Sequence, residues 1–312
     1  MSRPTAHARR YVVENGDPRT LRAVLALWGV EPEAAHEGRV FVDRKRATAD
    51  TPLEPGALVE VYPAQDASRT SDVRILAQRG GVVAVFKPAG IPTIPAHGGT
   101  GASVIAAVAR LLRIDDPGKV HTSSRLDADV SGVLLAATTA RARDALRQAR
   151  ERGDYQRHYV AIAAAVPKVL RATIDEPIGR APDRRSQRVR GADAVPSVTH
   201  YAVVATAGGC ALVAAEPVTG RTHQIRVHLA HAGAPLVGDG TYGSRRTVAM
   251  PSGAVRDPKR IALHAAWVSV RLGPDEPPWV VRAPVPSELP ALWRELGGCD
   301  DDWQRAIDPI AA

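Results

Sequence analysis

The sequence is poor in cysteine, and nothing in it marks export or a membrane span. Its two cysteines, Cys210 and Cys299, fit no CxxC or Cys/His metal spacing. A disulfide framework and the usual zinc sites are therefore not indicated, and a reducing cytoplasm suits the chain best. No apolar run is long enough to cross a bilayer, and the basic N-terminal residues precede no apolar signal segment. We expect a cytoplasmic protein without a membrane partner.

Length and charge indicate two domains and a polyanionic partner. At 312 residues the chain exceeds the usual single domain, which favours one large domain and one small one. Lys and Arg total 41 against 33 Asp and Glu, giving a net charge of +8 and a pI near 9.9. Such a balance suits nucleic acid, although a soluble basic protein without that partner would have it too.

Residues 1–62 read as a small α+β unit. The expected elements are helices over 19–28 and 31–35 and strands over 39–42 and 58–62, from apolar spacing and turn residues. This order, with Arg44 and Lys45 beside the first strand, resembles the small αL-type RNA-binding domain. An unrelated α+β unit is the alternative, because single sequences fix topology poorly.

Residues 63–73 are polar and aperiodic, so we interpret them as a linker to a large domain over 74–298, with 299–312 as a C-terminal tail. In the large domain several strand-like runs follow one another without a helix between them. We expect strands over 82–86, 132–137, 158–164, 201–205, 211–215, 262–270 and 279–282, and helices over 101–113, 140–152 and 222–232. This order predicts an α+β fold whose sheet is mixed and largely antiparallel, with flanking helices.

The first segment whose residues could take part in a reaction contains Arg125 and Asp127, just before a Ser131-Gly132 break and an apolar strand. A carboxylate at a strand entrance, beside an arginine and a flexible turn, is well placed to face a cleft. Taken alone, an aspartate in such a place is more often a turn residue, because its side chain bonds to its own backbone.

The second segment begins at Thr219, and in it Thr222 can cap a helix that Gly233 ends. Arg221 and Arg226 then lie near the helix start and on a neighbouring face. One of them could meet Asp127 while the other reaches a phosphate; a solvated basic helix is the alternative. A third segment, residues 82–95, runs from a strand into Lys87-Pro88 and a glycine-proline turn.

Together these segments resemble the RluA family of pseudouridine synthases. The matching motifs are FKPAG at residues 86–90, SRLDADVSGVLL at 124–135 and GRTHQIRVHLAHAGAPLVGDGTYG at 220–243, and the likeness covers about residues 74–295. The resemblance implies that Asp127 attacks a flipped uridine, that Arg226 is its ion-pair partner, and that Tyr159 packs on the uracil and helps remove the C5 proton. It implies no cofactor and no metal.

The resemblance also implies an RNA partner, ribosomal RNA first and transfer RNA second, bound by a monomer. Physical reasons agree with this resemblance. A base that reacts must leave the stack of its neighbours, and an aromatic side chain then provides a surface on which it can stack. An adjacent arginine favours the ionised form of the carboxylate. Arg125 matches the position that displaces the base. The residues expected to bind RNA are Arg125, Arg221, His223, Gln224, Lys87, Arg44 and Lys45.

Two departures from the family leave alternatives open. The family usually has His and Thr where this chain has Ser124 and Val130, so a catalytically impaired RNA-binding member is one rival. The other rival is a metal-dependent hydrolase, with ligands drawn from His97, His121, Asp127, His223, His228 and His231. On a helix His228 and His231 share a face while His223 turns away, and no HExxH is present, so we favour a site without metal.

Overall fold

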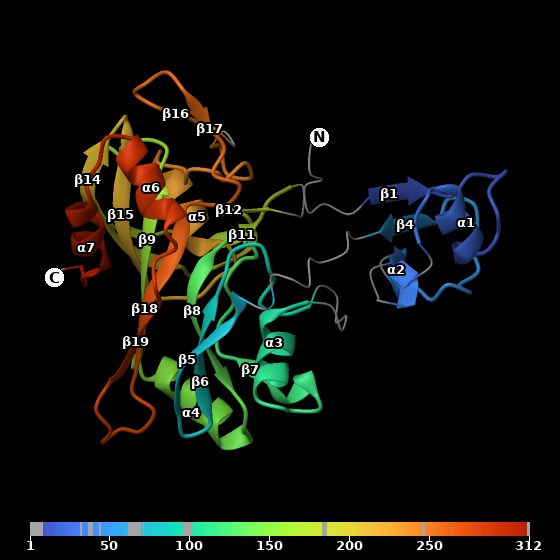
Figure 1. The fold of residues 1–312 in the computed structure, drawn as a ribbon, viewed down its shortest axis with the longest axis horizontal. Helices are drawn as coiled ribbons and strands as arrows, with labels where there is room; N and C mark the ends of the chain where they lie inside the picture. The colour runs from blue at the N-terminus through green and yellow to red at the C-terminus, as the bar shows by residue number, and fades with distance from the viewer. Residues whose placement is uncertain are drawn as a thin grey trace.

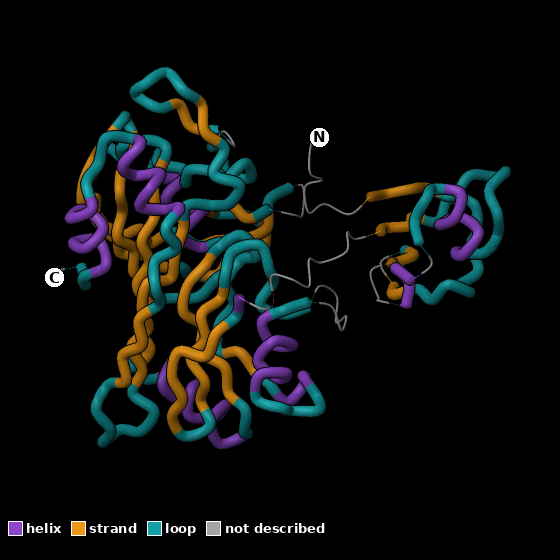
Figure 2. The backbone as a smooth tube through the Cα atoms, in the orientation of Figure 1, coloured by secondary structure: helices purple, strands orange, loops and turns teal. Residues whose placement is uncertain are grey.

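A computed structural model describes residues 9–31, 33–36, 40–43, 45–61, 70, 72–95, 102–182, 186–244 and 247–310. Its strands form a four-stranded sheet early in the chain, a ten-stranded sheet from Arg74 onward, and two small sheets (Figures 1 and 2). The described residues contain no helix that is long and apolar enough to span a membrane.

The four-stranded sheet is antiparallel, in the order β1-β4-β2-β3. Its elements are β1 (Arg9–Val12), α1 (Leu21–Leu27), α2 (Glu33–His36), β2 (Val40–Val42), β3 (Lys45–Arg46) and β4 (Leu58–Val61). Leu21, Val24 and Leu25 of α1 are buried in its core, as the helical spacing predicts. The two predicted helices and two predicted strands are confirmed, whereas β1 and β3 were not predicted, because such short strands carry little periodicity.

The large sheet has the order β10-β14-β15-β9-β18-β8-β6-β5, with β19 on β18 and β7 on β8. Its strands are β5 (Arg74–Arg79), β6 (Val82–Lys87), β7 (His121–Thr122), β8 (Ser131–Ala137), β9 (Tyr155–Ala163), β10 (Arg171–Asp175), β14 (Val198–Ala207), β15 (Cys210–Pro217), β18 (Leu263–Val270) and β19 (Trp279–Arg282). Only the pair β18–β8 is parallel among the described pairings of this sheet. The expected mixed, largely antiparallel α+β fold is confirmed.

Helices cover both faces of this sheet (Figure 1). They are α3 (Val104–Leu111), α4 (Ala140–Glu151), α5 (Gln224–His231), α6 (Glu288–Glu295) and α7 (Asp300–Ile307). Side chains of a strand point alternately to the two faces of its sheet, so neighbouring residues of β9 contact different helices. Tyr159 and Ala161 pack in the core with α3 and α5, whereas Val160 and Ile162 pack with α6 and α7. Helix α4 packs on β6 and β8 through Leu146 in a third cluster.

The two small sheets lie outside this framework. One has three antiparallel strands, β11 (Ile178–Arg180), β12 (Gln187–Val189) and β13 (Ala192–Val195); the other has two, β16 (Val248–Ala249) and β17 (Val255–Arg256). None of these short strands was predicted from the sequence.

The residues expected as a C-terminal tail contain α7. Trp303 and Ala306 of α7 are buried in the core with α6. The carbonyls at its C-terminal end are paired: a His158 ring nitrogen lies 2.7 Å from Ala306 O, and Trp267 Nε1 donates to Ile307 O at 2.9 Å. These bonds satisfy two of the carbonyls that a helix end leaves free.

A glycine lies where the two parallel strands at the centre of the sheet approach each other closely. Gly132 in β8 has φ of 132°, and a Cβ there would lie 2.3 Å from Ala265 O of β18. Only glycine permits this approach, so the Ser131-Gly132 break is required by packing. It places the start of β8, and with it the preceding loop that carries Asp127, beside the start of β18.

Candidate active site

Asp127 lies in the loop before β8, and a second loop from a distant part of the sequence holds that loop in place. Thr93 clamps Leu126 twice, since its hydroxyl donates to the Leu126 carbonyl at 2.8 Å and accepts from the Leu126 N–H at 3.0 Å. The Gly90 N–H donates to Ala128 O at 2.7 Å. The segment that contains Asp127 and the segment of residues 82–95 therefore form one structural unit.

Lys87 completes this unit from inside the protein. Its ammonium donates to the carbonyls of Pro88, Ala128 and Val130, at 2.9, 2.8 and 2.6 Å, and the residue is fully buried. Burial lowers the pKa of Lys87 to about 7, and the carbonyls can use all three hydrogens of its charged form. The expectation that Lys87 contacts RNA is wrong, because its charged end faces only backbone. It holds the loop of Asp127 instead.

The variant Lys87→Met tests this role. Methionine keeps most of the volume but leaves the carbonyls of Pro88 and Val130 without the ammonium donor, while Ala128 O keeps the Gly90 N–H, so we expect the free energy of unfolding to fall by about 1–3 kcal/mol. Urea denaturation measures the loss. Lys259→Met is the control, since the Lys259 side chain is 81% exposed. Equal stability of the two variants would contradict the role.

Arg226 of α5 lies between two carboxylates. Its Nη1 donates to Asp127 Oδ2 at 2.8 Å, while Nε and Nη2 donate to the two oxygens of Asp239 at 2.7 and 2.9 Å. Burial alone would lower the pKa of Arg226, but bonds and charges from Asp239 and Asp127 outweigh it, so the pKa is raised. Of the two arginines considered from the sequence, Arg226 is the one that meets Asp127.

Asp239 is the residue that sequence reasoning missed. It is 1% exposed and its bidentate contact fixes the plane of the Arg226 guanidinium. The sequence did contain a sign of its importance, since Asp239 lies between Gly238 and Gly240 in the motif of residues 220–243. Gly238 has φ of 82°, and a Cβ there would lie 2.0 Å from Arg260 O, so the chain must turn tightly beside the loop that precedes β18 before it reaches Asp239.

Helix α5 begins differently from the expectation that Thr222 caps it. The N-cap residue is His223, whose backbone is left-handed with φ of 58°. The Gln224 side chain organises the turn instead: its oxygen accepts from Thr219 Oγ1 and the Arg221 N–H, and its nitrogen donates to Val198 O and Thr199 Oγ1. The expected contact of Gln224 with RNA is wrong, because its amide is buried and fully used.

His223 faces Asp127 across the site. Its Nε2 lies 3.8 Å from Asp127 Oδ1, and its Nδ1 lies 2.6 Å from the Tyr242 hydroxyl. The Gln187 N–H also donates to that hydroxyl, which thus joins His223 to the backbone of β12. Burial lowers the pKa of His223, so the imidazole is neutral near pH 7. Tyr242 also lies under Arg226, 4.9 Å from ring centroid to guanidinium carbon.

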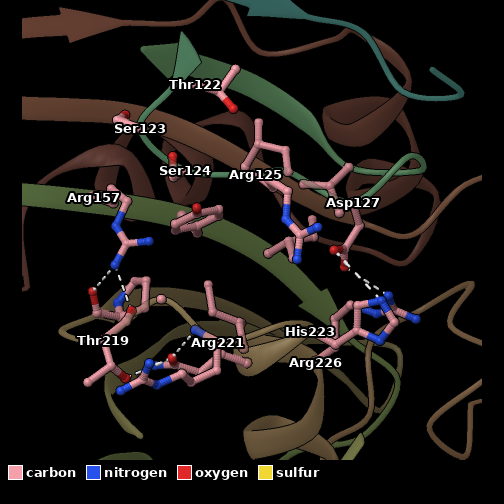
Figure 3. Close-up of a pocket in the computed structure, with 18 of the residues that line it drawn as sticks. Thr122, Ser123, Ser124, Arg125, Asp127, Arg157, Thr219, Arg221, His223 and Arg226 are labelled. Atoms are coloured by element: carbon pink, nitrogen blue, oxygen red, sulfur yellow. Dashed lines mark hydrogen bonds and ion pairs between the residues drawn. The ribbon is translucent and has the colours of Figure 1, made fainter. Parts of the chain in front are cut away.

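Asp127, His223 and Arg226 line a pocket of about 320 Å³, within the range of small-molecule sites (Figure 3). Tyr159 forms part of its wall, and burial raises the pKa of the Tyr159 hydroxyl. Arg125 and Arg221 line it as exposed residues. A second cavity of about 260 Å³ shares Asp127 with the first. The structure thus brings Asp127, Arg226 and Tyr159 together, as the resemblance implies.

The two departures from the family pattern have different surroundings. Ser124 lines the pocket with its Oγ 3.5 Å from the Tyr155 hydroxyl, and that hydroxyl lies 2.9 Å from Ser123 Oγ. Hydroxyl groups therefore supply polar contacts beside the position of the family's histidine. Val130 is buried in the apolar core, where its side chain packs without needing a hydrogen-bond partner.

The histidines considered as metal ligands do not converge in the part of the chain that is described. There, no group of three or more His, Cys, Asp or Glu is arranged to hold a metal ion, and His97 lies outside the described residues. His228 is buried, with Nδ1 2.9 Å from Thr199 Oγ1 and Nε2 3.0 Å from Glu176 O. Its two nitrogens are already used.

Comparison with known proteins identifies the family. The sequence pattern of the RNA pseudouridylate synthase family matches residues 81–231. An uncharacterized RNA pseudouridine synthase of Chloroflexus aurantiacus is 32% identical over 274 residues, 83% of this chain and 82% of that protein. A ribosomal large subunit pseudouridine synthase D of Xanthomonas campestris is 32% identical over 296 residues, 89% of this chain and 86% of the relative.

Solved structures agree on the fold. The human RNA pseudouridylate synthase domain containing 4 superposes with a TM-score of 0.59 at 23% identity, covering 74% of this chain and 95% of that one. The human RNA pseudouridylate synthase domain containing 1 gives 0.57 at 24% identity, covering 77% and 98%. With relatives above 30% identity along most of both chains, this protein belongs to the RluA family and is an RNA pseudouridine synthase.

Proposed function

We propose that the protein converts a uridine of ribosomal RNA to pseudouridine, with Asp127 as the catalytic carboxylate and without a cofactor. The observation that carries this proposal is the Asp127 carboxylate at a pocket wall, held by Arg226 at 2.8 Å. The choice of ribosomal RNA follows the name of the Xanthomonas relative, a ribosomal large subunit enzyme.

The geometry leaves one oxygen of Asp127 available for chemistry. Oδ2 is bound by Arg226, whereas Oδ1 lies 3.8 Å from His223 Nε2, which is too far for a hydrogen bond. The neighbouring guanidinium favours the ionised carboxylate, the form that can act as a nucleophile. Because Asp239 fixes Arg226 in advance, no rearrangement of this pair is needed when the reaction begins.

The uridine must leave its stack to reach this oxygen. We place its uracil against the Tyr159 ring, since stacking on an aromatic side chain contributes about 1–3 kcal/mol per base. The N1–C1′ bond then breaks, the base turns, and C5 bonds to C1′ while the C5 proton leaves and N1 gains one. Atoms and electrons balance without a redox partner. The raised pKa of Tyr159 works against a phenolate base, so we assign Tyr159 to stacking.

We further propose the remaining roles from position. Arg125 and Arg221 are exposed at the pocket and contact RNA, Arg125 by replacing the flipped base. His223 faces the uridine beside Asp127. In the N-terminal RNA-binding domain, residues 1–62, Lys45 is exposed on β3 and available to phosphates, while Arg44 lies outside the described residues.

We keep a linker that starts at residue 63 but place its end before Thr70, because Val73 is buried in the core of the large domain and Arg110 of α3 donates to Thr70 O. We extend the catalytic domain through at least Ile307, because α7 belongs to its core. We propose that the protein acts as a monomer, because the pocket with Asp127, Arg226 and Tyr159 is formed without residues of a second copy. We propose a cytoplasmic location from the ribosomal RNA substrate named for the bacterial relative.

Tritium release tests the activity and the substrate together. The full-length protein is incubated with large-subunit ribosomal RNA or with transfer RNA, each carrying tritium at C5 of uridine. Formation of the C5–C1′ bond releases the label, and we expect release from ribosomal RNA. Release from transfer RNA alone would overturn the substrate, and no release from any RNA would support the catalytically impaired RNA binder. Pseudouridine mapping in cells with and without the gene then names the site.

A further inference from the structure

Four arginines besides Arg226 line the pocket. They are Arg125, Arg150, Arg157 and Arg221. Within the described residues none of the four lies within 4.0 Å of a carboxylate, although many other arginines of the protein form such pairs. A cluster of positive charges that make no such pair, beside a site for a nucleotide, suits an anionic ligand.

Three of these arginines donate hydrogen bonds to backbone carbonyls: Arg221 to Pro196 O, and Arg150 and Arg157 to carbonyls nearer to each other. Arg150 at the end of α4 donates through Nη1 to Ser123 O. Arg157 on β9 donates through Nη2 to Pro217 O at 3.0 Å and to Thr219 O at 2.6 Å. Carbonyl groups fix the direction of a guanidinium but do not neutralise it. Both guanidinium carbons also lie over the Tyr155 ring, 5.5 and 5.8 Å from its centroid.

The two guanidiniums converge above Gly220. A Cβ at that residue would lie 2.8 Å from Arg150 Nη2 and 3.2 Å from Arg157 Nη1, so both side chains approach the same point of the backbone. Burial lowers the pKa of Arg150, and the charge of Arg157 lowers it further. An anion between them would relieve this repulsion and complete their hydrogen bonding.

Arg150 and Arg157 lie apart from Asp127 and from Arg226, which binds it. In Figure 3 Arg157 points to Thr219, while Asp127 and the partners that hold it lie on the other side of the pocket. A ligand bound at the pair would reach from the uridine pocket toward the loop after β15. The phosphodiester beside a flipped nucleotide is the anion that RNA would bring there.

We propose that Arg150 and Arg157 form a binding subsite for one phosphodiester of the RNA strand next to the flipped uridine. The inference rests on the proposed function for the nature of its ligand. Guanidiniums match phosphate oxygens with paired hydrogen bonds. A phosphate contact carries no sequence information but fixes the register of the strand, so this subsite positions the uridine over Asp127 without reading neighbouring bases.

Salt-dependent binding tests the subsite independently of turnover. Affinity of the full-length protein for a fluorescein-labelled RNA hairpin with uridines in its loop is measured by anisotropy over a range of salt concentrations. The variants are Arg150→Met, Arg157→Met and the double variant. The matched control is Arg147→Met, which removes an exposed arginine one turn earlier on α4 that pairs with Glu151.

Because both arginines hold one phosphate, the double variant should lose about one unit of the slope of log K against log salt, not two. The loss should be the same for a hairpin with cytidine in place of the loop uridines, and Arg147→Met should leave the slope within about 0.2 of wild type. A structural role alone would lower the melting temperature and leave the slope unchanged. An unchanged slope in the double variant overturns the subsite.

Failure of the subsite and failure of the proposed function are distinguishable. If wild type releases no tritium but the double variant still loses salt slope, the subsite stands for an RNA binder and the enzymatic proposal falls. If wild type releases tritium and the double variant keeps the slope, only the subsite falls. In an active wild type, we expect the double variant to raise KM about tenfold, the loss of one charge-assisted contact, with kcat within about twofold.

Discussion

Asp127→Asn is expected to retain the fold and to lose pseudouridine formation, with kcat at least about 10⁴-fold below wild type. Asparagine has the size of aspartate but lacks the negative charge that the proposed attack on the uridine requires. The fold should survive because the Asp127 side chain is 25% exposed and Arg226 keeps its two bonds to Asp239. Single-turnover tritium release gives the rate, and thermal unfolding checks the fold.

The matched control for this variant is Asp129→Asn. Asp129 is exposed in the same loop, two residues from Asp127, and lines neither of the two cavities that Asp127 shares. It should therefore keep kcat within about twofold of wild type. RNA affinity of Asp127→Asn should also stay close to wild type, since the contacts with the strand remain. Activity of Asp127→Asn within tenfold of wild type would remove Asp127 from the chemistry.

Asp239→Asn is expected to lower both stability and rate. The substitution takes away the charge that holds Arg226 by two hydrogen bonds, in a place that is 1% exposed. Loss of one partner of a buried ion pair costs about 3–5 kcal/mol of unfolding free energy. The Arg226 guanidinium then loses its fixed plane, and a displacement of about 1 Å at a reacting group lowers the rate about 10²-fold.

A double-mutant cycle separates the two effects. Asp239 touches no substrate in this proposal, so it is a positioning residue that acts on Asp127 through Arg226. On the background of Asp127→Asn, the change Asp239→Asn should lower the residual rate by less than threefold but should still reduce stability in urea. If Asp239→Asn leaves the rate of the otherwise wild-type protein unchanged, the contacts that connect Asp239 through Arg226 to Asp127 have no part in catalysis.

Local pattern was sufficient for the general fold, whereas the candidate carboxylate was singled out by the resemblance to the RluA family. Consecutive strand-like runs without intervening helices predicted the mixed, largely antiparallel sheet, because the alternation of apolar residues is a property of each segment alone. Asp127 and Arg226 were named from motifs whose residues are close in sequence. Helices α6 and α7 were not predicted; each spans only eight residues, and such short helices depend on packing for their stability.

The sequence by itself determined which groups this protein has for its chemistry: a carboxylate at a strand entrance, arginines on a helix start and an aromatic residue on a strand. Only the tertiary structure decided how they are used. Arg226 meets Asp127 across 99 positions because the sheet brings their segments together. Lys87 and Gln224 bind backbone in the interior instead of RNA, and Asp239 locks Arg226. Burial and partners of a polar side chain depend on distant segments, which periodicity along one segment does not encode.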